Sequence, residues 1–288
     1  MLVDLIQTTT RDGVRLDGIF QESSQDEGPF PLDAVCFVHG TGGNFYSSAL
    51  FEYLGQQFLK NGASVLRVNT RGHDGLSTAV TDKGGRRQGA AFELVDDCRH
   101  DITAWMDWLK QLGCERIALV GHSLGAVKSI YAQSHEPNPN ISCLIALSPP
   151  RLSYEWFCAG DQRELFLETF QKAETLVSNG QANQLMEVKL PLPFVISAAG
   201  YVEKYGPEER YNFLRFIAGV KCPLLLTLGG EEIVSNMAFR DTTAALQSLS
   251  PRPKKLTVET IPSGDHFYSG VREELGEVVE KWMEGVLK

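Results

Sequence analysis

The chain has 288 residues, and 36 acidic against 27 basic side chains give it a formal net charge of −9. Hydrophobic residues make up 43% and charged residues 22%, which is ordinary for a globular protein and excludes a disordered, collagen-like or coiled-coil chain. A chain of this length can bury a large core without disulfide bonds or structural metals. The net negative charge disfavours nucleic acid and anionic lipid as partners, because both bind basic surfaces.

The N-terminus and the cysteines indicate the compartment. The sequence begins Met1-Leu2-Val3-Asp4-Leu5, with no basic segment followed by a long apolar run, so we expect no secretory signal peptide. No window approaches the ~18 apolar residues of a membrane span. We predict buried free thiols, not a disulfide framework or a metal site, because no CxxC pair occurs among Cys36, Cys98, Cys114, Cys143, Cys158 and Cys222. These features predict a cytoplasmic protein.

The first predicted element is a hairpin. Residues 5–10 and 14–20 flank Asp12-Gly13, a dipeptide typical of tight hairpin turns, and a polar loop covers residues 21–31. Beyond that loop, short apolar runs alternate with segments of helical spacing. The runs predicted as strands are 34–38, 63–68, 116–120, 141–147, 223–228 and 256–261. Such continuous apolar strands indicate a mostly parallel sheet covered by helices on both faces.

Helical patterns lie between these runs, including one near 237–249 and a terminal one from about Arg272. Residues 151–220 break the alternation, with helical patterns and no convincing strand. Pro207 is expected to open a helix there, since proline is tolerated in a first helical turn. About 70 residues are too many for a plain loop. We therefore expect a helical cap at 151–220 over a core formed by 1–150 and 221–288.

A G-x-S-x-G motif follows the run at 116–120. Gly121-His122-Ser123-Leu124-Gly125 lies between a predicted strand and a predicted helix, which is the setting that a nucleophile elbow requires. A sharp turn there would hold the serine in a strained backbone conformation, and small flanking residues would allow neighbouring backbone to approach. The pattern predicts that Ser123 is a nucleophile.

With this motif in place, the chain resembles serine hydrolases of the α/β-hydrolase fold, of the esterase and lipase type. The resemblance covers essentially the whole chain and implies the order nucleophile, acid, histidine. It places the histidine at His266, in a loop after the last predicted strand, where imidazole can take and return the serine proton. The implied acid is Glu232, three residues after Gly229, with Glu231 as the alternative if the match is anchored on Ile233.

The turn at His39-Gly40-Thr41-Gly42-Gly43 ends the strand that, by the same resemblance, contributes an oxyanion hole. The implied donors are the backbone N–H groups of Thr41 and Leu124. No nucleotide-binding glycine motif is present, so we expect no nucleotide, no other cofactor and no metal. The turn at 71–75, Arg-Gly-His-Asp-Gly, resembles a structural turn of the family and is assigned to packing.

The sequence therefore predicts a hydrolase that cleaves a carboxylic ester or thioester of a small molecule through an acyl-enzyme on Ser123. A serine at the elbow argues against the haloalkane dehalogenase and epoxide hydrolase reactions, which use a carboxylate nucleophile. The His39 turn and the strand end at 228–232 are also similar to a group containing siderophore-ester hydrolases. Peptidase, C–C hydrolase or acyltransferase chemistry, or ligand binding without catalysis, stay open. The oligomeric state is not predicted.

The cap segment is rich in apolar side chains, and we expect some of them to line an acyl site. The candidates are Phe157, Phe166, Phe170, Leu185, Met186, Phe194, Val195, Ile196 and Tyr201.

Overall fold

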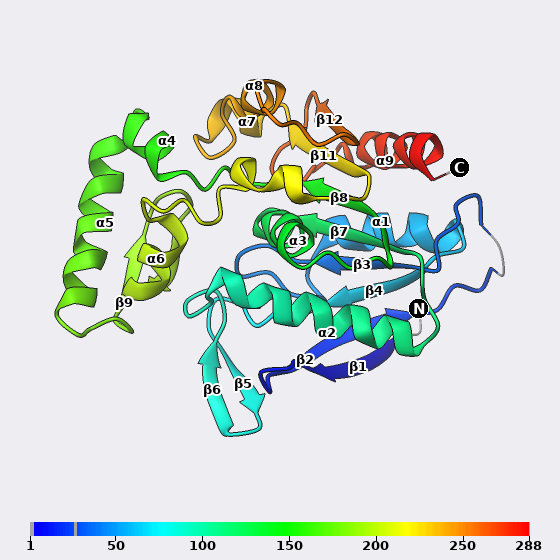
Figure 1. Cartoon of the computed structure of the whole chain (residues 1–288), viewed down its shortest axis with the longest axis horizontal. Coiled ribbons are helices and arrows are strands. Elements are labelled where there is room, and N and C mark those ends of the chain that lie inside the picture. The colour runs from blue at the N-terminus through cyan, green and yellow to red at the C-terminus, as the bar shows by residue number, and fades with distance from the viewer. Residues whose placement is uncertain (1–2, 26–27, 288) are drawn as a thin grey trace.

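The computed structural model describes residues 3–25 and 28–287. Met1 and Leu2, part of the N-terminal expectation, lie outside this range, as do residues 26–27 of the expected loop and Lys288. An eight-stranded sheet forms the centre of the molecule, in the order β1-β2-β4-β3-β7-β8-β11-β12 (Figure 1). Its strands are β1 (Asp4–Thr9), β2 (Arg15–Gln21), β3 (Ala34–Val38), β4 (Ser64–Val68), β7 (Ile117–His122), β8 (Ile141–Leu147), β11 (Leu224–Gly229) and β12 (Leu256–Ile261).

Six of these strands, from β4 to β12 in the sheet order, are parallel to one another, and only the β1–β2 and β2–β4 pairs are antiparallel. Helices α1 (Ala49–Lys60) and α9 (Arg272–Val286) pack on one face, and α2 (Cys98–Gln111) and α3 (Leu124–His135) pack on the other. Because both faces are covered, every side chain of β3 is buried, as the continuous apolar run 34–38 predicts. The α/β-hydrolase fold expected from the sequence is confirmed.

The hairpin predicted around Asp12-Gly13 is present as β1 and β2. A second hairpin, of β5 (Ser77–Thr81) and β6 (Gly84–Gln88), has no counterpart in the sequence-based description. Four of the five β6 residues are Gly or Arg and four are exposed, so neither an apolar run nor a clear alternation marks this strand. The helix expected near 237–249 is shorter, limited to α8 (Thr242–Gln247) after the one-turn α7 (Glu232–Ser235).

The first part of the segment between β8 and β11 lies at one side of the sheet, and its last part, residues 213–219, returns to pack against α3 (Figure 1). The segment contains α4 (Tyr154–Ala159), α5 (Arg163–Ser178) and α6 (Ala198–Tyr205), as expected for a largely helical segment. The expectation that it holds no strand is wrong, because β9 (Leu185–Val188) and β10 (Phe194–Ser197) form an antiparallel pair. At four residues each, with two prolines in the link between them, these strands are too short to show a period.

The helix expected to open at Pro207 is also absent from this segment. Residues 206–212 form turns, and α6 ends before them at Tyr205. Only short 3-10 helices follow, at Phe213–Arg215 and Ile217–Gly219. Glu209 lies at a positive φ of 51°, which a right-handed helix cannot contain. Its carboxylate instead accepts hydrogen bonds from Ser153 and Asn212, so tertiary contacts fix this turn.

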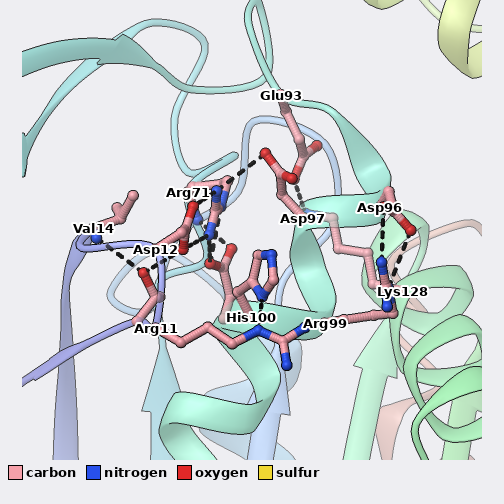
Figure 2. A network of polar contacts seen from close by, with 12 residues as sticks. Arg11, Asp12, Val14, Arg71, Glu93, Asp96, Asp97, Arg99, His100 and Lys128 are labelled. Carbon is pink, nitrogen blue, oxygen red and sulfur yellow. Dashed lines mark hydrogen bonds and ion pairs between the residues drawn. The ribbon is translucent and has the colours of Figure 1, made fainter.

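A buried arginine joins three parts of the core (Figure 2). The guanidinium of Arg71, only 1% exposed, pairs with Asp101 at 2.8 Å, Asp12 at 2.8 Å and Asp97 at 3.0 Å. Asp12 lies in the β1–β2 turn, and Asp97 and Asp101 lie at the start of α2. The turn at residues 71–75 therefore has the packing role that the sequence indicated. It ties the loop after β4 to a hairpin and a helix that are distant in the sequence.

All six cysteines are free thiols, and four of them are buried. Burial raises the pKa of the Cys36 and Cys143 thiols well above the usual range, so both remain protonated at neutral pH. None of the described helices has the length and apolar character of a membrane span. Over the same described residues, no three His, Cys, Asp or Glu side chains are grouped so as to hold a metal ion.

Candidate active site

Ser123 occupies the sharp turn between β7 and α3. Its backbone has φ 57° and ψ −127°, a strained conformation for a residue with a side chain. The strain is held by neighbouring structure, since the Ser123 N–H donates to the carbonyl of Leu147 on β8 at 2.8 Å. The hydroxyl thereby stands at the carboxyl end of the sheet, where open α/β sheets bind ligands.

The glycines of the motif are required by close backbone approach. A Cβ on Gly121 would lie 2.3 Å from the carbonyl oxygen of Gly125, and one on Gly125 would lie 2.1 Å from that of Val38. Gly40 faces the serine itself, because a Cβ there would lie 2.8 Å from the Ser123 Cβ. A side chain at any of these three positions would overlap neighbouring atoms, which explains why each of them is glycine.

The structure brings together the three side chains that the sequence nominated. His266 Nε2 lies 3.0 Å from Ser123 Oγ, and His266 Nδ1 lies 2.7 Å from Glu232 Oε2. His266 comes from the loop after β12, and Glu232 from the first residue of α7 after β11. With the histidine proton on Nδ1, Nε2 is free to accept a proton from the serine hydroxyl.

Glu232 is 3% exposed and its second oxygen is also bound. Oε1 accepts hydrogen bonds from the Gly229 N–H at 2.7 Å and from the Ser148 hydroxyl. Glu231, the alternative acid, is exposed, and its backbone N–H donates to the Gly264 carbonyl at 3.0 Å. The histidine therefore meets Glu232 and not Glu231.

The backbone amides of Thr41 and Leu124 are the candidates for an oxyanion hole. Thr41 and Leu124 both line the cavity that holds Ser123. Neither amide N–H donates a hydrogen bond to an acceptor in the described part of the chain. Leu124 is the first residue of α3, so its N–H also lies at the positive end of a helix dipole. The pair is free to meet an anionic oxygen.

His39 shapes the same turn. Its Nδ1 donates to the Gly40 carbonyl at 2.8 Å, and its Nε2 accepts from the Thr70 N–H at 3.0 Å. Burial, with a further contribution from the Lys128 ammonium, lowers the pKa of His39 to about 3. The ring is therefore neutral at physiological pH, and its two contacts fix the peptide that precedes Thr41.

Ser123 opens into a cavity of about 590 Å³. Its wall is mostly apolar and includes Leu50, Phe51, Leu152, Leu192, Ala238, Phe239 and Phe267. A cavity of this size accommodates a small organic ligand. Its polar groups gather around the serine, at the start of α1 and at the start of α9.

A family model described as the alpha/beta hydrolase fold matches residues 33–190, more than half of the chain. The chain belongs to this family. The match begins just before β3 and includes the Ser123 turn, so this hydrolase-fold protein carries the elbow inside the matched region. No curated protein sequence matches the chain.

Solved structures share the fold of this family member at low sequence identity. One is Est1E from Butyrivibrio proteoclasticus, solved with ferulic acid, at 18% identity and a TM-score of 0.66, covering 97% of this chain and 98% of that one. The Pyrococcus furiosus esterase Pf2001 has 20% identity and a TM-score of 0.63, with 100% and 92% covered. The alpha/beta hydrolase GrgF from Penicillium sp. sh18 has 15% identity and a TM-score of 0.68, with 100% and 99% covered.

The sequence did not indicate His122 as part of the hydrolase-fold site. His122 Nε2 donates to the backbone carbonyl of His266 at 2.7 Å and so holds the loop of the triad histidine. Burial and the nearby His266 lower the pKa of His122 to about 3, so the ring is neutral and keeps its donor. The second position of a G-x-S-x-G motif is variable, and only the loop packed against it reveals this role.

Ser148 and Tyr268 were also missed. The Ser148 hydroxyl contacts both Glu232 and, at 2.8 Å, the Tyr268 hydroxyl, which lies 2.7 Å from Thr227 Oγ1. Burial, reinforced by the Glu232 charge, raises the pKa of Tyr268, so the phenol stays protonated. No sequence signal marks these residues, because Ser148 follows β8 and Tyr268 lies in the loop after β12.

The side chains of residues 151–220 that were expected to line an acyl site lie away from the cavity at Ser123. The cavity is lined from this segment by Leu152, Pro191, Leu192 and Tyr205. The nine candidates do not line it, and six of them (Phe157, Phe166, Phe170, Met186, Ile196 and Tyr201) are buried among other apolar side chains. Phe166 stacks on Phe170 with ring centroids 6.1 Å apart, so helical periodicity identified the interior of the segment and not the wall of the cavity.

Proposed function

We propose that the protein is a serine hydrolase that cleaves carboxylic esters or thioesters of small molecules. The observation that carries the proposal is the unbroken line of contacts from Ser123 through His266 to Glu232, opening into an apolar cavity. Membership of the alpha/beta hydrolase fold family supports it. So does the fold relative Pf2001, which is named as an esterase, since the same fold carries that chemistry in it.

In the proposed mechanism, Ser123 Oγ attacks the substrate carbonyl carbon while its proton passes to His266 Nε2. Glu232 holds the Nδ1 proton and stabilises the imidazolium. The carbonyl oxygen becomes an oxyanion and accepts from the Thr41 and Leu124 amides. Collapse breaks the bond to the alcohol or thiol, which leaves with the proton from His266. Water then attacks the acyl-enzyme with His266 as base, and releases the acid and the free serine.

We further propose that residues 151–220 act as a cap that sets substrate choice. Leu152, Pro191, Leu192 and Tyr205 line the cavity that contains Ser123. The cap also contacts the core away from the cavity, since the Ser197 N–H donates to the Ala91 carbonyl at 2.8 Å. Peptidase, C–C hydrolase and acyltransferase reactions use the same triad, and they serve as alternative outcomes of the test.

The test combines covalent labelling with turnover. A fluorophosphonate should label the wild-type protein at Ser123, because only an activated serine attacks phosphorus. Ser123→Ala should abolish the labelling and lower kcat for p-nitrophenyl esters by about 10³-fold or more, while the circular dichroism spectrum stays that of a folded protein. A wild-type protein that neither reacts with the probe nor hydrolyses any p-nitrophenyl ester from acetate to decanoate would instead be a non-catalytic ligand-binding member of the fold.

A further inference from the structure

One end of the cavity is built from the starts of two helices. Ser47, Ser48 and Ala49 at the start of α1, and Ser269 and Arg272 at the start of α9, all line it. The helices pack against each other, so these two starts lie on one side of the cavity. Arg272 is the only Asp, Glu, Lys or Arg side chain among the lining residues of the described chain.

Arg272 has no partner among residues 3–25 and 28–287. It forms no hydrogen bond or ion pair with the described residues, and its Nε is buried without an acceptor. The acidic neighbours Glu273 and Glu274 are exposed in the first turn of α9 and do not pair with it. A buried guanidinium nitrogen without an acceptor is costly unless a ligand supplies one.

The position of this arginine does not serve the helix. A cation in the first turn opposes the helix dipole, which favours acidic residues at that end. The amides at the start of α1 add positive potential to the same end of the cavity, although the Phe51 N–H is already bound by the capping Ser48 hydroxyl. The arrangement is thus complementary to an anion, and the described part of the chain supplies no acceptor for Arg272.

We propose that the natural substrate carries an anionic group, a carboxylate or a similar oxyanion, which binds Arg272 while its ester bond lies at Ser123. Carboxylate oxygens match the planar guanidinium in a two-point contact. The net charge of −9 does not draw anions to the protein, so the selectivity arises from this local contact. The inference rests on the proposed function and specifies its substrate class.

The experiment compares esters that differ only in charge. One pair places the charge on the acyl side, p-nitrophenyl hydrogen adipate against p-nitrophenyl 5-carbamoylpentanoate. The other places it on the alcohol side, 4-acetoxybenzoate against 4-acetoxybenzamide. In at least one pair, the wild-type kcat/KM for the anionic member should exceed that for the neutral amide by about tenfold or more, which also tells which side of the substrate bears the charge.

Substitution of the arginine should remove the preference. Arg272→Gln should reduce the anionic-to-neutral ratio of kcat/KM by about 10- to 100-fold, and Arg272→Lys should restore part of it, since lysine keeps the charge without the planar fork. Lys281→Gln is the matched control, because it removes one positive charge from an exposed position of the same helix. Its ratio should equal that of the wild type.

Two results would overturn the inference and are distinguishable. If the wild-type protein hydrolyses the neutral members at least as well as the anionic ones, or if Arg272→Gln leaves the ratio unchanged, the arginine is not a substrate-binding group and the ester hydrolase stands. If none of the four esters is hydrolysed and the fluorophosphonate leaves Ser123 unlabelled, the proposed function fails and the substrate class fails with it.

Discussion

Two groups of buried charges, one around Ser123 and one around Arg71, differ in whether they face a cavity. Around Ser123, the buried Glu232 carboxylate points through His266 toward a space of about 590 Å³. Around Arg71, the guanidinium and Asp101 are as buried as Glu232, but they pair with each other and with the partly exposed Asp12 and Asp97 (Figure 2). Both sets join segments distant in sequence, so burial and long-range pairing alone do not identify a catalytic site.

The buried charges around Arg71, which face no cavity, continue toward the proposed cap. Lys128 of α3 pairs with Glu93, and Lys204 of α6 lies 3.8 Å from the same carboxylate. Burial raises the pKa of Glu93, but the two ammonium groups outweigh it and hold the pKa below its usual range. What distinguishes the site at Ser123 is that the serine lines a cavity, together with Thr41 and Leu124, whose amides have no acceptor among the described residues. The following predictions test this contrast.

The largest expected effect is a loss of stability when the buried charges around Arg71 are disrupted. Arg71→Met should lower the free energy of unfolding by about 3–5 kcal/mol, measured by urea denaturation, because Asp101 would remain buried without its partner. Arg116→Met is the control, since its pair with Asp33 is more than half exposed on the arginine side and should contribute less than about 1 kcal/mol. Equal stability of the two variants would contradict the assigned role of Arg71.

The next effect separates the two adjacent carboxylates. Glu232→Gln should lower kcat for a p-nitrophenyl ester by about 10²-fold or more, because the imidazolium loses its charged partner. Glu231→Gln, an exposed neighbour with the same change in charge, should alter kcat by less than about threefold. Similar, mild effects from both substitutions would mean that another group orients His266.

The cap should govern substrate size through the residues that line the cavity. Leu192→Ala and Tyr205→Ala should change the ratio of kcat/KM between long and short acyl esters by about 1–3 kcal/mol, the range for a changed pocket contact. Phe166→Ala is matched to them in the same segment, but its side chain packs inside it. The Phe166→Ala variant should lose stability and keep the acyl-chain preference. A changed preference in this variant would contradict the placement of Phe166 inside the segment.

The smallest effect is a pH dependence of stability. His122 has a folded pKa of about 3 and an unfolded pKa near 6.5, so the unfolded chain binds the extra proton between these values. Its contribution is present above about pH 6.5 and is lost as the pH falls toward 3, by roughly 1–2 kcal/mol between pH 7 and 5. His122→Gln keeps a donor but does not titrate, so its stability should fall less over that interval. Equal losses of stability in the wild type and in His122→Gln would contradict the assignment of this pH dependence to His122.

The sequence by itself determined the family, the sheet and the candidate nucleophile. Apolar runs of five to seven residues predicted strands such as Ala34–Val38 and Ile141–Leu147, because parallel strands buried on both faces require them. The glycines around Ser123 predicted the elbow, since a side chain there would overlap the neighbouring backbone. The resemblance to α/β-hydrolases supplied the order of Ser123, an acid at Glu232 or Glu231, and His266.

Only the tertiary structure decided the rest. It separated Glu232 from Glu231, because one residue of register decides which carboxylate faces His266. It assigned cavity-lining positions to Leu192 and Tyr205 and not to the aromatic stripe of α5. Helical periodicity shows that a stripe of side chains is buried, but it does not show whether the stripe faces the cavity or the interior of the cap. It also brought Arg272 to the cavity from the start of α9. No local pattern encodes these placements, because each depends on which distant segment packs against the residue.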